Sequence, residues 1–217
     1  PFNFRSWKWA AFLLAAFGFR VLFGLYCPPI LVAEDEIQTY AIGLKCYTTH
    51  TWPYFGPDVQ GMDTDFKTQI PGALEALLIA VPLKAWPVPE SPYLFLNLLS
   101  FLALSLLAWY CWKRLPVLSP WFVFTWIYIA PWTLHYSTQI INPSYLVFGC
   151  VLFFLGFLET VPSFSSRIFP VWFSNFLMGF GLFWAMQLHM SWVLLAPFVL
   201  ASLVMQIKAG TFKTACG

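Results

Sequence analysis

Three consecutive carboxylates, Glu34, Asp35 and Glu36, follow the first long apolar stretch of this chain. Charged side chains are costly beside a bilayer and mark functional sites when they occur there. A carboxylate in such a place can act as a general base that takes a proton from an acceptor hydroxyl. The same residues also suit the start of a helix, where the dipole favours negative charge, so both interpretations stay open. Successive helical residues point about 100° apart, so one or two of the three face a common pocket.

A second polar run, 135–144, joins two apolar stretches and contains an imidazole, hydroxyls and amides. Within it, Asn142 suits a helix N-cap and Pro143 suits the first helical position, so the pair predicts a helix start. This run contains more polar side chains than helix capping requires. The excess also favours a second interpretation, in which the run forms one wall of a site that binds sugar or phosphate. We take His135, Gln139 and Asn142 as candidate substrate-binding residues.

A third polar interruption separates the last two apolar stretches and contains Gln187 and His189. A turn between helices needs polar residues, but these two side chains also suit contact with an anionic headgroup. Lys67 and Gln69, in the long polar region after the first apolar stretch, complete the candidate substrate-binding set, and Lys67 would neutralise a phosphate. A divalent metal ion is an open alternative for that charge, although no ligand spacing in the sequence identifies a metal site.

The composition assigns the chain to a membrane, since 60% of its 217 residues are hydrophobic and 9% are charged, against about 25% charged in soluble domains. No basic patch or RNA-reading motif is present, which argues against nucleic acid as a partner. The first residue is not Met and the end is abrupt, so we expect a fragment of a longer protein. The five cysteines lack zinc spacing; buried thiols are expected, with a Cys27–Cys46 disulfide as the alternative.

The predicted fold is all-α, a polytopic transmembrane bundle of about six spans. A helix needs about 20 apolar residues to cross the hydrocarbon core. The predicted spans are 9–26, 92–112, 120–134, 145–158, 168–188 and 191–206. The first outer loop, 27–91, is predicted to carry interfacial helices near 35–49 and 70–86.

The distribution of Lys and Arg decides how the stretch 70–86 is interpreted, because these residues collect in cytoplasmic loops. If the stretch does not span, most cations fall on one face, and most acids and all three histidines fall on the other. If it spans, the polar loops scatter over both faces. We therefore predict an interfacial or re-entrant helix, which places the acidic cluster, the run 135–144 and His189 together on the outer face.

Two motifs resemble the GT-C superfamily of membrane glycosyltransferases. They are the acidic motif at 33–40 (AEDEIQTY) and the sequence 69–74 (QIPGAL) that ends the long outer loop. The likeness is to relatives of the dolichyl-phosphate-mannose protein mannosyltransferases and of the lipid A aminoarabinose transferase. The run 135–144 is similar to the second outer loop of that family, and two glycines precede the polar residues at 187–191 as in relatives. The resemblance covers nearly the whole chain, as the N-terminal half or less of a family member.

This resemblance implies transfer of a sugar from a polyprenyl-phosphate donor to an acceptor hydroxyl, with membrane lipid as a further partner. It implies that Asp35 is the general base, with Glu34 and Glu36 beside it, and that Asn142 stands where relatives often have a second acid. We expect the bacterial inner membrane as the location, with the endoplasmic reticulum membrane as the alternative. Two other classes stay open: a multispan transporter, which the lack of internal repeats disfavours, and a non-catalytic membrane subunit.

Overall fold

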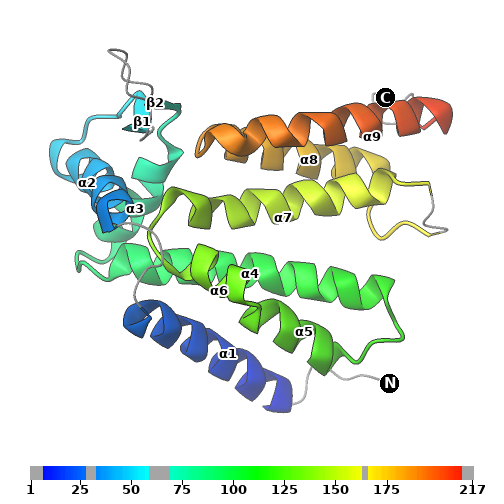
Figure 1. The fold of residues 1–217 in the computed structure, drawn as a ribbon, viewed down its shortest axis with the longest axis horizontal. Coiled ribbons are helices and arrows are strands. Elements are labelled where there is room, and N and C mark those ends of the chain that lie inside the picture. Colours follow the sequence, from blue (N-terminus) through cyan, green and yellow to red (C-terminus); the bar gives the residue numbers. More distant parts are fainter. Residues whose placement is uncertain (1–6, 28–32, 59–68, 163–165, 212–217) are drawn as a thin grey trace.

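A computed structural model describes residues 7–27, 33–58, 69–162 and 166–211. Figure 1 shows long helices side by side, with a smaller cap at one end. The bundle consists of α1 (Trp7–Tyr26), α4 (Ser91–Arg114), α5 (Pro120–Ile129), α6 (Pro131–Thr138), α7 (Asn142–Thr160), α8 (Val171–Met186), the 3-10 turn η1 (Met190–Leu195) and α9 (Ala196–Lys208). The cap consists of α2 (Ala33–Thr49), α3 (Leu74–Ala85) and the antiparallel strands β1 (Phe55–Asp58) and β2 (Gln69–Pro71).

Four helices of the described part are long and apolar enough to cross a membrane. They are Trp7–Tyr26, Ser91–Arg114, Asn142–Thr160 and Met190–Lys208, the last of which joins η1 to α9. Large apolar side chains such as Leu14, Leu102 and Leu200 remain exposed on these helices, as expected where the surrounding solvent is lipid rather than water. The prediction of an all-α integral membrane protein is therefore confirmed.

The predicted span 120–134 is interrupted in the structure, where α5 ends and α6 begins at Pro131. Proline lacks the N–H of a regular helix, so carbonyls of the preceding turn lose their partners. The Thr133 hydroxyl donates at 2.8 Å to the Ile127 carbonyl, which faces the proline, and at 2.8 Å to the Ala130 carbonyl, which also accepts from the Leu134 N–H. Arg20 of α1, fully buried, donates to the Tyr128 carbonyl at 2.9 Å and to the Ser137 hydroxyl. The break is thus held by side chains on two helices.

Helices α7 and α8 cross closely because glycines lie at their contact. A Cβ atom at Gly181 of α8 would lie 2.7 Å from the Phe153 amide nitrogen and would also meet the Gly149 carbonyl. At the end opposite the cap, the Glu159 carboxylate pairs with Arg114 and accepts from the backbone N–H of Ile168 at 2.8 Å. These contacts fix α8 against α7 and α7 against α4.

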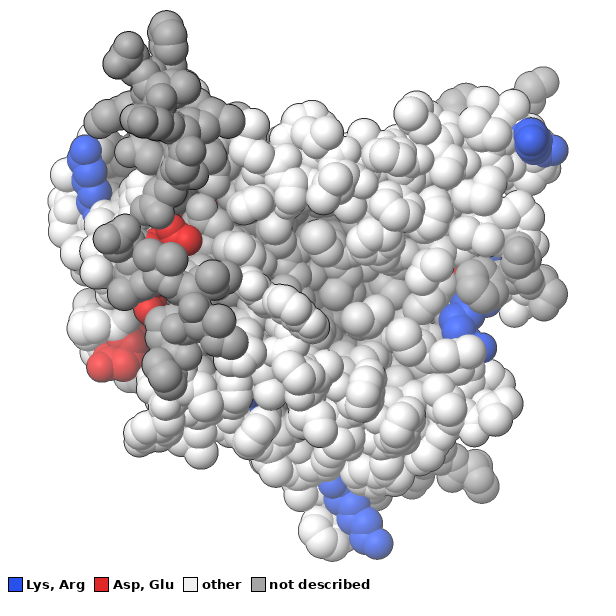
Figure 2. All heavy atoms as spheres, in the orientation of Figure 1, with Lys and Arg blue, Asp and Glu red and all other residues white. Residues whose placement is uncertain are grey.

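The charged side chains seen in Figure 2 lie mostly at the two ends of the bundle, with the carboxylates gathered at the cap end. Among the described side chains, the cations at the end opposite the cap are Lys8, Lys113, Arg114, Arg167 and Lys208. The carboxylates of the cap end are Asp35, Glu36, Glu75 and Glu90. The cap end also carries the cations Lys45 and Lys84, and the opposite end also carries the Glu159 carboxylate. Among the described side chains, acids therefore outnumber cations at the cap end, and cations outnumber acids at the other end.

Candidate functional site

The first turn of α2 brings part of the acidic run to the cap. Asp35 and Glu36 are both half-buried. Burial raises the pKa of the Glu36 carboxyl above its usual range. The structure describes the backbone of Glu34 but not its side chain, and Lys67 lies outside the described residues.

A third carboxyl, Glu75, lies at the centre of the site, and the sequence-based set of candidates missed it. It occupies the first turn of α3 and is 2% exposed. With the Asn142 amide nitrogen turned toward it, that nitrogen donates to the Glu75 carboxylate oxygens at 2.5 and 2.8 Å and to the Thr39 hydroxyl at 2.9 Å. The starts of α3 and α7 and one turn of α2 therefore meet at one polar cluster, formed by Asp35, Thr39, Glu75 and Asn142.

Burial raises the pKa of Glu75 to about 8, because a carboxylate loses its hydration in the protein interior. A hydrogen bond from Thr39 opposes this change, and the negative charge of nearby Asp35 adds to it. At neutral pH the Glu75 carboxyl is therefore mostly protonated. Carboxyls whose environments differ in this way are typical of sites that use one as an acid and another as a base.

Asn142 does not cap α7, which corrects the sequence-based interpretation of the Asn-Pro pair. The residue before it, Ile141, occupies the capping position, and no side chain caps the first turn. Pro143 still falls in the first turn, where it lacks the N–H that would go unpaired. The Asn142 side chain is consequently free to join α7 to Thr39 and Glu75.

Several buried polar atoms near the cluster lack a hydrogen-bond partner within the described residues. They include the Ser144 and Tyr145 hydroxyls, at the start of α7, and the Gln139 side-chain nitrogen just before it. Tyr145 is fully buried and lies close enough to Glu75 and Glu36 to feel their charges. Buried polar groups are nearly always paired in folded proteins. Of these three residues only Gln139 also lines a cavity, so its nitrogen is a candidate for a ligand contact.

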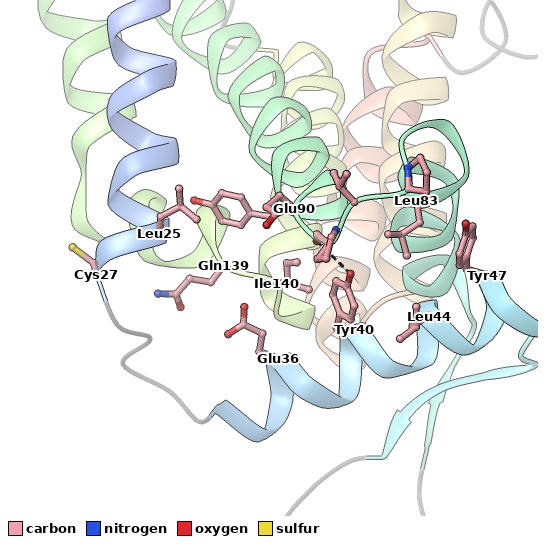
Figure 3. Close-up of a pocket in the computed structure, with 15 residues that line it drawn as sticks. Leu25, Cys27, Glu36, Tyr40, Leu44, Tyr47, Leu83, Glu90, Gln139 and Ile140 are labelled. Carbon is pink, nitrogen blue, oxygen red and sulfur yellow. Dashed lines mark hydrogen bonds between the residues drawn. The ribbon is translucent and has the colours of Figure 1, made fainter.

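A pocket of about 690 Å³ opens beside the cluster. Figure 3 shows Glu36 and Gln139 facing into it from α2 and from the segment before α7. Most of the remaining wall is apolar or aromatic, and it comes from the end of α1, from α2, from the α3–α4 connection and from the start of α4. Across this wall the Tyr40 hydroxyl donates to the Pro89 carbonyl at 3.2 Å. An apolar cavity with a few convergent polar groups is typical of a ligand site.

The other predicted residues lie at the same end of the bundle but in different surroundings. Gln187 packs against Gly72, because a Cβ atom added at Gly72 would lie only 2.8 Å from the Cα of Gln187. His189 accepts from the Ser191 N–H at 3.1 Å and so caps η1; burial lowers the pKa of its imidazole. The His135 ring packs edge-on against Phe23, with 5.2 Å between ring centres. Gln69 is exposed on β2.

The structure therefore brings together Asp35, Glu36, Gln139 and Asn142, and it adds Glu75. Of the predicted residues whose side chains the structure describes, only Glu36 and Gln139 line the pocket; Asp35 and Asn142 lie in the adjoining cluster with Glu75, and His135, Gln187, His189 and Gln69 lie elsewhere. Cys27 and Cys46 are free thiols rather than a disulfide. Within the described part of the chain, no group of three His, Cys, Asp or Glu side chains is arranged to hold a metal ion.

Comparisons with known proteins give no relative for this chain. No family model, no curated protein and no solved structure matches it. The chemistry of the acidic cluster and its pocket is therefore what distinguishes between candidate functions.

Proposed function

We propose that this protein is a membrane glycosyltransferase of the GT-C type, with Asp35 as its general base. It would move a sugar from a polyprenyl-phosphate donor to an acceptor hydroxyl at the outer face. One observation carries the proposal: the Glu36 carboxyl lines an apolar pocket, and the carboxyls of Asp35 and Glu75 lie in the cluster next to it, at one end of a bundle of membrane helices. A lipid-linked donor presents its scissile bond at this depth, where chain and headgroup meet.

The reaction requires one base and one path for the leaving group. Asp35 takes the proton of the acceptor hydroxyl, and the acceptor oxygen then forms a bond to the anomeric carbon. The bond from that carbon to the phosphate oxygen breaks, and its electron pair leaves on the polyprenyl phosphate. Attack from the face opposite the phosphate inverts the anomeric carbon, by the geometry of inverting glycosidases.

The pocket matches the two parts of such a donor. Its apolar wall, which includes Leu25, Leu44 and Ile140, suits the first isoprene units. Gln139 and Glu36 offer an amide and a carboxyl for sugar hydroxyls. Lys67 remains the proposed partner of the phosphate, because positive charge stabilises the leaving group as it departs.

The proposed topology has six spans, formed by α1, α4, the broken pair α5–α6, α7, α8 and η1–α9. Their alternating directions put the cap, the α6–α7 connection and the α8–η1 corner at one end of the bundle. The basic end of the bundle would face the cytoplasm by the positive-inside rule, which leaves the cap outside. We propose the bacterial inner membrane as the location.

The test is transfer by the full-length protein in proteoliposomes that contain polyprenyl-phosphate sugars and a soluble acceptor. Asp35→Asn should lower transfer by about 10²- to 10⁴-fold, because the amide cannot accept the proton. The melting temperature should stay nearly unchanged, since Asn is isosteric with Asp. Lys45→Gln, which changes one exposed charge on the same helix, should retain full transfer. Undiminished transfer by Asp35→Asn would refute the assignment of the base.

A further inference from the structure

The Asn142 amide can face Glu75 with either its oxygen or its nitrogen, and each orientation requires a different state of Glu75. An ionised carboxylate only accepts hydrogen bonds, so it requires the Asn142 nitrogen. A neutral carboxylic acid carries one O–H, which donates to the Asn142 oxygen. In this second orientation the Thr39 hydroxyl donates to the same amide oxygen at 2.9 Å. The proton on Glu75 therefore decides which end of the amide points away from it.

The surroundings of Glu75 favour the neutral acid. Its carboxyl is 2% exposed, and no Lys, Arg or His among the described residues forms an ion pair with it. The titratable group that acts on Glu75 directly is Asp35 on α2, and Tyr145 on α7 lies near both Glu75 and Glu36. Further out, Tyr93 on α4 lies between Glu36 and the cation Arg20 of α1, and Arg20 acts on Tyr93 rather than on Glu75. A buried charge without a cation is costly, and a second negative charge beside Asp35 adds to that cost.

We propose that Glu75 is a positioning residue that, as a neutral acid, donates to the Asn142 amide oxygen and turns the amide nitrogen toward the substrate. This inference rests on the proposed function, because it assigns Glu75 a role in that same transfer site. Glu75 itself does not touch the substrate. It acts through Asn142, and it leaves Asp35 without a second ionised carboxyl beside it.

The two states of Glu75 predict different activities. With neutral Glu75, the half-buried Asn142 offers N–H donors, which suit phosphate or sugar oxygens. When Glu75 ionises, the amide turns its nitrogen back to the carboxylate, and a new negative charge faces the anionic donor. Transfer should therefore fall as pH rises through the pKa of Glu75, which is about 8.

The first experiment compares Glu75→Gln and Glu75→Leu with the wild type in the full-length protein. Gln keeps a donor for the Asn142 oxygen and cannot ionise, whereas Leu offers no donor. Above the pKa, wild-type transfer should fall by about tenfold per pH unit. Glu75→Gln should transfer sugar at the wild-type rate at neutral pH, and its rate should not fall at alkaline pH. Glu75→Leu should transfer sugar more slowly than the wild type at every pH. A purely structural role predicts the same pH profile for Gln and Glu, and that result would overturn the proposal.

A second experiment needs no transfer reaction. Infrared spectra of the purified full-length protein should contain a carboxylic-acid C=O band at neutral pH that is absent in Glu75→Gln. The band should disappear as pH rises through about 8, and at lower pH in Asp35→Asn, where the neighbouring charge is removed. If the band is present but the wild type transfers no sugar, the proposed function is refuted, whereas the protonated state of Glu75 is supported. If the wild type transfers sugar and the band is absent, the inference alone is overturned.

Discussion

The Arg20 guanidinium of α1 donates a 2.9 Å hydrogen bond to the Tyr128 carbonyl in the last turn of α5. The last carbonyls of a helix lack partners within it, and the helix dipole favours a cation at that end. Arg20 therefore stabilises the interruption before Pro131 from a neighbouring helix. The chain beyond this interruption carries Gln139 and Asn142, so Arg20 supports the position of two site residues.

Arg20→Met should destabilise the protein, because the Tyr128 carbonyl and the Ser137 hydroxyl lose their donor in a buried place. Each buried polar group left unsatisfied costs about 1–3 kcal/mol. Arg20→Lys should restore part of the loss, since one ammonium can reach one of the two acceptors. Thermal unfolding in lipid nanodiscs measures the effect, with Lys8→Met, at the exposed start of the same helix, as control. A melting temperature of Arg20→Met equal to that of the wild type would contradict this role.

Stability should depend on pH through Glu75. Its pKa is about 8 in the folded protein, against an ordinary value of 4.5. Between these values the folded state holds a proton that the unfolded state has released, so stability falls as pH rises. The contribution is complete below pH 4.5 and is lost as pH passes about 8. Melting temperatures across this range should decline in the wild type and decline less in Glu75→Gln; equal slopes would show that Glu75 is not responsible.

Two glycines of α8 should respond in opposite ways to the same substitution. Gly181→Ala places a methyl group against the backbone of α7, at 2.7 Å from the Phe153 nitrogen. The helices must separate, which costs about 1–3 kcal/mol by overpacking. Gly179→Ala meets no atom within 4 Å and should be neutral or stabilising, because alanine favours the helix by about 1 kcal/mol. Unfolding of both variants under identical conditions checks the difference, and equal melting temperatures would argue against the close crossing.

Cysteine labelling tests which end of the bundle faces outward. In a background without the native cysteines, Lys113→Cys should resist a membrane-impermeant reagent applied to intact cells, because it lies at the end opposite the cap. Tyr54→Cys, an exposed position of the cap, should be labelled. Permeabilised cells should give labelling at both positions. Labelling of Lys113→Cys in intact cells would invert the proposed topology and leave the cap on the cytoplasmic side.

The sequence predicted the coarse fold because span length and acidic helix starts are local properties. Apolar length identified the membrane helices, and the acidic turn at Asp35 and Glu36 predicted the helix near 35–49, which the structure places at Ala33–Thr49. The residue Pro131 predicts a weak point in any helix, but the partner that stabilises the interruption, Arg20, is distant in sequence. Such a contact depends on how helices pack, which no local pattern specifies.

Glu75 shows where the prediction of the site failed. A carboxylate in an otherwise apolar helix is a signal, since burial of such a group needs compensation. Its meaning depends on α3 folding back against α2 so that Glu75 meets Asn142 and Thr39. The Asn-Pro pair likewise predicted a helix start, while the direction of the Asn142 side chain was decided by the neighbouring helices.

The contact between Gly72 and Gln187 couples two parts of the protein that are distant in sequence. Gly72 has a φ angle of +127°, and no room remains for a methyl group between its backbone and Gln187. The tight fit places the β2 end of the cap directly against the corner that joins α8 to η1. Any movement of this part of the cap away from the bundle would therefore have to break a contact that lies beside the last membrane helix.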